Sequence, residues 1–436
     1  MKLFQRMLVA STALGFIAPL GVQASDINIE EIGTYVRKRA SSKQNKLNSK
    51  TFSNELATIK EPKVDSSELK FNHFEAGGFS DTTTLDGKVI MALGAIDGAD
   101  ELSSTLTGSA NFNSVYQMNL NTSFSGDDNL YIRLKGGEFN DAFKMKGSTY
   151  HIDAKDTANP DGAIEFTVDK IWYSFPIGDS FTATVGPKIE NYYMLAATPS
   201  VYKPGALKAF KLGGHSSAFG ASTSTGAGIK YEADNGFATS LTLNSKGAAG
   251  SSGLLTDQDE NKVNTMVAYT ADQYHVSATY SKQHNGWDAW SYYATTDAAS
   301  DSSIESADAY ALRAWWRPQE TGTVVPSISV GYDVINFEGH DIANDASGYM
   351  VGFNWQDTFQ PDDRIGLAMG SVLSVNSYKA SASDPTEVEP FLWEAYYSFK
   401  PNGSILVTPA IFGGSDVEAD TDDDILGAVV TTTFKF

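Results

Sequence analysis

The feature that most restricts how this chain can fold is a two-residue alternation of apolar and polar side chains over long segments. Between residues 111 and 124, Phe112, Tyr116 and Leu120 fall on one phase, while the other phase is mostly Asn and Gln. A β-strand projects successive side chains to opposite faces, so this pattern predicts a strand with one apolar and one polar face. Strands of soluble proteins usually have about 5 or 6 residues, whereas a tilted strand of about 9–11 crosses a bilayer. The segment therefore predicts a membrane-spanning strand.

The same alternation returns at 130–135, 349–356, 391–399 and 425–436. After the N-terminal region, no segment approaches the run of about 20 apolar residues that a membrane-spanning helix needs. A closed barrel is the other structure that pairs all its backbone polar groups in lipid. The pattern therefore favours an all-β fold, a transmembrane antiparallel β-barrel. An exported soluble β-sandwich is the alternative, but it gives no reason for all the long loops to lie at one end.

Sixteen strands are predicted, an even number that places both ends of a closed barrel on the same side. They cover residues 83–95, 112–123, 129–137, 163–177, 180–187, 223–233, 236–244, 263–271, 273–281, 308–317, 322–334, 347–356, 363–373, 389–399, 403–411 and 425–436. Short turns rich in Gly, Asp, Asn and Pro alternate with long polar links, as expected for periplasmic turns and external loops. The long links are 96–111, 138–162, 188–222, 245–262, 282–307, 335–346, 374–388 and 412–424.

The N-terminal 24 residues have the layout of a secretory signal, with Lys2 and Arg6 before an apolar run from 7 to 20 and small residues before a cleavage point at Ser25. An N-terminal membrane anchor is the alternative, although the run is short for a span. Residues 25–70 are rich in Ser, Lys and Asn, with a basic run at 37–39. This segment is predicted to be a periplasmic lead-in, either a solvated linker or a contact to peptidoglycan or anionic lipid. The barrel is predicted to occupy 71–436.

Composition excludes several classes of function. The chain has no cysteine, so disulfides and thiolate metal sites are ruled out. The formal charge of −21 becomes −23 once Lys2 and Arg6 leave with the signal, which argues against a nucleic-acid partner. The six histidines do not form an HExxH motif, and neither a GxSxG elbow nor a phosphate-binding glycine loop occurs. We therefore expect no enzyme activity, no cofactor and no metal site, with an outer-membrane barrel enzyme kept as an alternative.

The final strand carries apolar residues in phase and stops on an aromatic residue. Phe434 and Phe436 fall on the face predicted to meet lipid, and Phe436 is the last residue. Such an ending resembles the signal that the outer-membrane assembly machinery of Gram-negative-type bacteria reads. Export to the outer membrane, with membrane lipid and that machinery as partners, is the expected fate.

Three segments resemble cyanobacterial outer-membrane porins, which are related to the carbohydrate-selective (OprB-like) and iron uptake porins: 74–87, 186–192 and 226–231. The resemblance covers about 71–436, and the opening 1–5 is also similar to porins of marine picocyanobacteria. It implies a homotrimeric passive channel for small hydrophilic solutes, with sugars, inorganic ions and iron species as candidates. Many members carry an S-layer-homology domain before the barrel; the 25–70 segment is too short for one, so a short form is expected.

Channels of the type that the chain resembles fold their third external loop inward as a constriction, which implies that role for 188–222. The implied constriction residues are Lys188, Glu190, Tyr192, Tyr193, Tyr202, Lys203, Lys208 and Lys211. Their net charge of +3, in a chain that is acidic overall, predicts a preference for anions at the narrow point. The alternative is that these lysines only solvate an exterior loop.

Other charged and aromatic residues have expected positions in a barrel. The predicted pore lining consists of Arg133, Lys135, Arg313, Arg364 and Glu394. Acidic runs in the external loops, the longest at 416–424, are either solvated loops or an acidic rim for cations, without the spacing of a defined calcium loop. Trp172, Trp316, Trp355 and Trp393 are expected in interfacial aromatic girdles.

Three functional hypotheses follow. The first is a passive porin without cofactor. The second is a largely plugged structural barrel that tethers the outer membrane to the cell wall through its basic lead-in. The third is a barrel enzyme.

Overall fold

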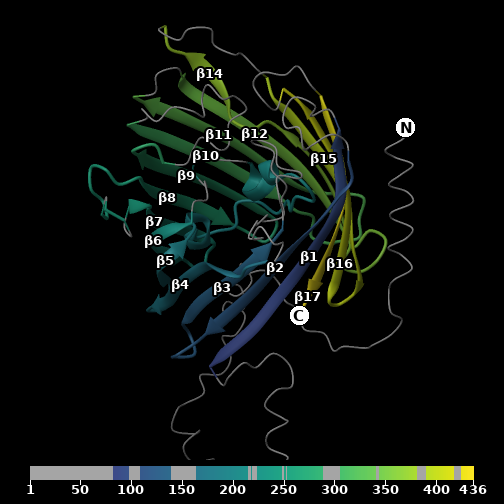
Figure 1. Ribbon diagram of the computed structural model, residues 1–436, viewed down its shortest axis with the longest axis horizontal. Coiled ribbons are helices and arrows are strands. Elements are labelled where there is room, and N and C mark those ends of the chain that lie inside the picture. Colours follow the sequence, from purple (N-terminus) through teal and green to yellow (C-terminus); the bar gives the residue numbers. More distant parts are fainter. Residues whose placement is uncertain are drawn as a thin grey trace, which may run out of the picture.

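The described residues form one closed antiparallel β-barrel (Figure 1). The computed structural model describes residues 82–97, 109–138, 164–214, 218, 223–247, 250–251, 253–287, 305–339, 343–380, 389–416 and 424–436. Strand β1 pairs with β2 on one side and with the final strand β17 on the other, so the described sheet has no free edge. The predicted signal at 1–24 and the lead-in at 25–70 lie outside the described residues.

The strands follow one another around the barrel in sequence order, each antiparallel to its neighbours. Their bounds are β1 Thr83–Asp97, β2 Asn111–Thr122, β3 Asn129–Gly137, β4 Thr167–Ile177, β5 Phe181–Ile189, β6 Ser224–Glu232, β7 Phe237–Ser245, β8 Asn261–Thr270, β9 Tyr274–His284, β10 Ser306–Trp316, β11 Ser327–Glu338, β12 Ala343–Gln356, β13 Arg364–Gly370, β14 Ser374–Tyr378, β15 Phe391–Asn402, β16 Ile405–Ser415 and β17 Ile425–Lys435. Both β13 and β14 pair with β12, with a one-residue shift in register between them, so together they form one interrupted strand. Counted in this way, the barrel has sixteen strands, which confirms the predicted fold.

The predicted alternation matches the two faces of the wall. In β2, Phe112 is 58% exposed on the outer face, whereas Val115 and Gln117 are buried on the inner face. The outer faces of β8–β10 present Val267, Tyr280 and similar large apolar side chains. Within the described ranges, no helix has both the length and the apolarity to span a bilayer.

The prediction around β11 was wrong in its boundaries. The strand was expected over 322–334, but it runs over Ser327–Glu338, so the preceding turn is longer and the following external link shorter, only 339–342. Pro326 has no N–H to donate to a sheet ladder, and the carbonyl of Val324 instead accepts the Trp355 indole N–H at 2.9 Å. The side chains that follow then pair with β12 up to Asn336.

Two short turns on the same rim of the barrel share one design. In the β2–β3 turn, the Asp128 carboxylate accepts the backbone N–H groups of Phe124 and Ser125 and the Tyr173 hydroxyl at 2.7–2.9 Å. In the β12–β13 turn, the Asp363 carboxylate accepts three backbone N–H groups, from 358, 359 and 360, and a tyrosine hydroxyl of β15. Burial alone would raise the pKa of Asp363, but its hydrogen bonds together outweigh that effect, so the pKa is lowered. At Asp128 the hydrogen bonds from Ser125 and Tyr173 favour the ionised form and lower the pKa of the carboxyl.

The link between β5 and β6 folds back onto the inner wall. It contains two short 3-10 helices, η3 (Asn191–Met194) and η4 (Lys208–Gly213), drawn inside the barrel in Figure 1. Loop residues Tyr202, Leu207 and Phe210 are buried in one apolar cluster with inward side chains of β1, β2, β12, β13 and β15–β17. On another side, Leu195 and Ala218 belong to an apolar cluster with inward side chains of β8 and β10–β12. The described residues of this loop, 190–214, 218 and 223, position the candidate site.

Candidate functional site

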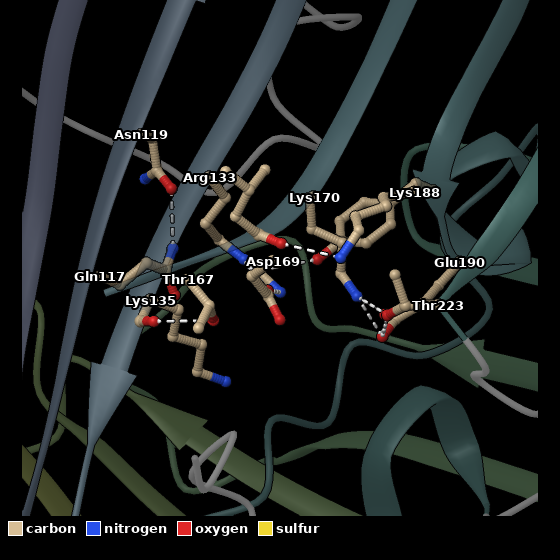
Figure 2. A network of polar contacts seen from close by, with 12 residues as sticks. Gln117, Asn119, Arg133, Lys135, Thr167, Asp169, Lys170, Lys188, Glu190 and Thr223 are labelled. Atoms are coloured by element: carbon tan, nitrogen blue, oxygen red, sulfur yellow. Dashed lines mark hydrogen bonds and ion pairs between the residues drawn. The ribbon is translucent and has the colours of Figure 1, made fainter. Parts of the chain in front are cut away.

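The neck of the loop is tied to the wall by one buried lysine (Figure 2). Lys170 of β4 forms an ion pair with Glu190 at 2.6 Å and also donates to the Thr223 hydroxyl. Thr223 in turn donates to Glu190 at 3.1 Å. Because Glu190 begins the loop and Thr223 ends it, the single ammonium of Lys170 holds both ends together.

A second ion pair lies beside the first on the inner wall. Arg133 of β3 donates through Nε to Asp169 at 2.6 Å (Figure 2). Its Nη1 donates to the Tyr193 hydroxyl of η3 at 3.1 Å. The register of β3 against β4 shifts by one residue at Asp169, as in a β-bulge, so Asp169 and Lys170 both reach the interior. The bulge thus produces a basic patch with two compensating carboxylates.

A continuous series of rings connects this patch to the loop. Tyr131 stacks on Trp172 with centroids 4.1 Å apart, Trp172 meets Tyr193 at 4.7 Å, and Tyr193 meets Tyr192 at 4.4 Å. The Lys211 ammonium lies 4.7 Å from the Tyr192 ring centroid, within cation–π range. Trp172 is therefore buried inside the barrel; its assignment to an outer girdle was wrong, because the bulge at 169 changes the phase of β4.

Glu394 of β15 is buried and anchors the middle of the loop. Its Oε1 accepts the Tyr202 hydroxyl at 2.6 Å and the Gly205 N–H at 3.0 Å, and its Oε2 accepts the N–H groups of Ala206 and Leu207 at 2.8 and 2.7 Å. Burial raises the pKa of the Tyr202 hydroxyl, and the Glu394 charge raises it further, so the hydroxyl remains a donor. Glu394 points inward as predicted but is covered by the loop.

Arg313 of β10 anchors the following part of the loop. Its Nε donates to the Leu212 carbonyl at 2.9 Å and its Nη2 to the Gly214 carbonyl at 3.3 Å. The same guanidinium contacts both oxygens of Asp333 on β11 at 2.7 and 3.0 Å. Arg313 is therefore also covered by the loop.

The predicted constriction lysines have different environments. Lys203 is exposed on the loop, and Lys208 and Lys211 of η4 are half-buried. Lys188 lies in β5 and not in the loop, and its Nζ donates to the Val168 carbonyl at 3.1 Å. The cations at 203, 208 and 211 all belong to the segment that Glu394 and Arg313 hold.

The other predicted lining residues also face inward. Lys135 is buried on β3, and Arg364 is half-buried on β13, close enough to the Tyr202 hydroxyl for its charge to act on it. Of the acidic external runs, most of 416–424 lies outside the described residues. Asp259 is buried and accepts the N–H groups of Gly247 and Leu255 at 2.8 Å, so it organises its own loop. Among the described residues, no group of three His, Asp or Glu side chains is arranged to hold a metal ion.

Sequence reasoning missed several residues that hold the loop: Asp169, Lys170, Ser329, Asp333 and Asn354. Ser329 Oγ accepts the N–H groups of Val201 and Tyr202, and Asn354 Oδ1 accepts that of Lys203. Polar residues on the inward phase of β11 and β12 were a usable signal. Their partners were not predictable, because they lie more than 120 residues away in the sequence.

Comparison with known proteins shows one matching family and several similar solved structures. The family described as "Carbohydrate-selective porin, OprB family" matches residues 40–436, which includes part of the lead-in as well as the barrel. The Pseudomonas putida OprB structure is similar with a TM-score of 0.53 at 12% identity, over 82% of this chain and 94% of that one. A triple mutant of the Rhodopseudomonas blastica porin gives a TM-score of 0.50 at 12% identity, over 81% and 100%.

At such identity the two structures support the fold alone, and no curated protein matches the sequence. The family match spans most of the chain and therefore establishes membership. With its closed sixteen-stranded barrel and its inward-folded loop, the chain belongs to the OprB family of carbohydrate-selective outer-membrane porins.

Proposed function

We propose that this protein is a passive channel through which small hydrophilic solutes, including sugars and inorganic ions, diffuse down their gradients. The observation that carries the proposal is that the described loop residues 190–214 lie against the inner wall of a closed barrel. A loop in that position narrows the lumen, so the side chains that it presents select what passes. No chemical step is required of any residue.

The test is a liposome-swelling assay with sugars of graded size. The proposal predicts rapid swelling with small sugars and a sharp loss of permeation above one size. Equal impermeability to all sugars by a correctly folded barrel would contradict it and would favour the structural alternative, in which the barrel is plugged and residues 25–70 hold the cell wall. Signal cleavage near Ser25, trimer formation, and assembly through Phe434 and Phe436 are further parts of the proposal.

We also propose that the loop lysines make the narrow region favour anions. Lys203, Lys208 and Lys211 lie on one held segment, and a concentration of one sign of charge in a low-dielectric passage biases ion entry. Replacing all three by Gln is expected to shift the reversal potential under a salt gradient toward cation preference. The control is Lys246→Gln, which removes a lysine that pairs with Glu260 outside the loop. An unchanged reversal potential in the triple variant would remove the lysines from the filter and leave the channel in place.

A further inference from the structure

Two buried charges of opposite sign grip the same short segment of the loop. Glu394 accepts N–H groups at 205–207, and Arg313 donates to carbonyls at 212 and 214. We propose that Glu394 and Arg313 are positioning residues, a loop clamp that fixes segment 202–214 and thereby sets the bore of the channel without touching the solute. This inference rests on the proposed function for its consequence, but the clamp itself can be tested separately.

The Glu394 half of the clamp follows from the cost of burying a carboxylate. Such a group is stable in the interior only when its oxygens accept strong hydrogen bonds. All four donors to Glu394 come from the loop: the hydroxyl of Tyr202 and three backbone N–H groups. The carboxylate and the loop therefore stabilise each other, and moving the loop away would leave both without partners.

The Arg313 half works with opposite polarity. Its guanidinium is neutralised by Asp333 and still donates to two loop carbonyls. On β11, a Cβ added to Gly331 would lie 1.7 Å from the Gly213 carbonyl oxygen, so only glycine admits the loop backbone at this distance. The loop thus meets the wall backbone directly at this point.

Steric fit fixes the segment at the Glu394 end. A Cβ on Gly205 would lie 2.4 Å from the Tyr396 ring, and one on Gly352 would lie 2.7 Å from the Tyr202 ring. The Tyr396 hydroxyl also donates to the Lys203 carbonyl while accepting from Asn354 at 2.9 Å. Charge and shape therefore specify one position of the loop, and the lysines on it occupy fixed places.

The decisive variants are Glu394→Gln and Gly205→Ala, with Glu232→Gln as the control. In the Glu394→Gln variant, either orientation of the amide places its NH₂ group against at least one loop N–H, so at least one of the hydrogen bonds from the loop is lost. In the Ala variant, the new methyl group pushes the loop off β15 toward the lumen. Glu232 lies at the end of β6 and pairs with Lys230 at 3.0 Å, away from the loop.

Two readouts are needed, both on full-length refolded protein whose heat-modifiable migration shows a folded barrel. Hydrogen exchange of the peptide covering 205–207 should be slow in the unmodified protein, accelerate strongly in Glu394→Gln, and stay slow in Glu232→Gln. Single-channel recordings should show fluctuating step sizes for Glu394→Gln and smaller steps for Gly205→Ala.

Unchanged exchange at 205–207 in a folded Glu394→Gln barrel would overturn the clamp. Wild-type conductance and noise in both folded variants would overturn its control of the bore. If the unmodified protein is silent in bilayers but its exchange pattern depends on Glu394, the clamp holds and the proposed channel function fails.

Discussion

Breaking the ion pair between Lys170 and Glu190 at the loop neck should destabilise the barrel more when one charge is removed than when both are removed together. The side chains of Lys170 and Glu190 are 2% and 13% exposed. Removing one member of a buried pair typically costs about 3–5 kcal/mol, because the other charge is left uncompensated. Since Glu190 keeps some exposure, we expect Lys170→Met to lower the free energy of unfolding by about 3 kcal/mol.

The double variant Lys170→Met/Glu190→Gln leaves neither charge buried and tests this reasoning. It should be about 2 kcal/mol more stable than the sum of the two single effects predicts. The assay is urea unfolding of the barrel in lipid vesicles, followed by tryptophan fluorescence. As a control, the surface pair of Lys246 and Glu260, which are 26% and 42% exposed, should give a coupling of only about 0–1 kcal/mol. Single effects that add to within about 0.5 kcal/mol at the neck would refute the account of a buried, coupled pair.

Three further outcomes are expected. The lowered pKa values of Asp128 and Asp363 contribute stability that is fully present above the unfolded pKa of about 4 and is lost as the pH falls below it. Replacing both residues by Asn should therefore reduce the change in the urea midpoint between about pH 5 and pH 2. Gly331→Ala places a methyl group against the Gly213 carbonyl, so the folded yield or the loop position must change, and wild-type yield together with wild-type conductance would exclude that close contact. Deleting Phe436, whose backbone exchanges two hydrogen bonds with β1, should reduce the amount of assembled barrel in membrane fractions; an undiminished amount would exclude it as an assembly signal.

The architecture of the wall was predictable from local pattern alone. In each strand, side chains that face lipid alternate with side chains that face inward, as Phe112 and Val115 do, and this alternation is visible in the sequence of the strand itself. The exceptions came from backbone irregularity. The bulge at Asp169 turned Trp172 inward, and Pro326 delayed the start of β11. One residue suffices to reverse a phase, so these shifts are invisible to an average over the strand.

The candidate site was predictable only in part. Its location in the third long link and its content of lysines followed from loop length, composition and resemblance. The roles of Glu394 and Arg313 could not be predicted, because the sequence pattern of an inward charged residue is the same whether the side chain contacts water or a loop. Their partners lie from about 100 to 190 residues away in the chain, and pairs at that separation form only once the barrel is closed.

The most direct test that this barrel is an open channel is the single-channel conductance of the refolded, unmodified protein in a planar bilayer. An open lumen narrowed by a fixed loop predicts discrete, stable steps that persist without applied energy or cofactor and scale with salt concentration. A barrel that is folded by heat-modifiable migration but inserts without any current would contradict the channel.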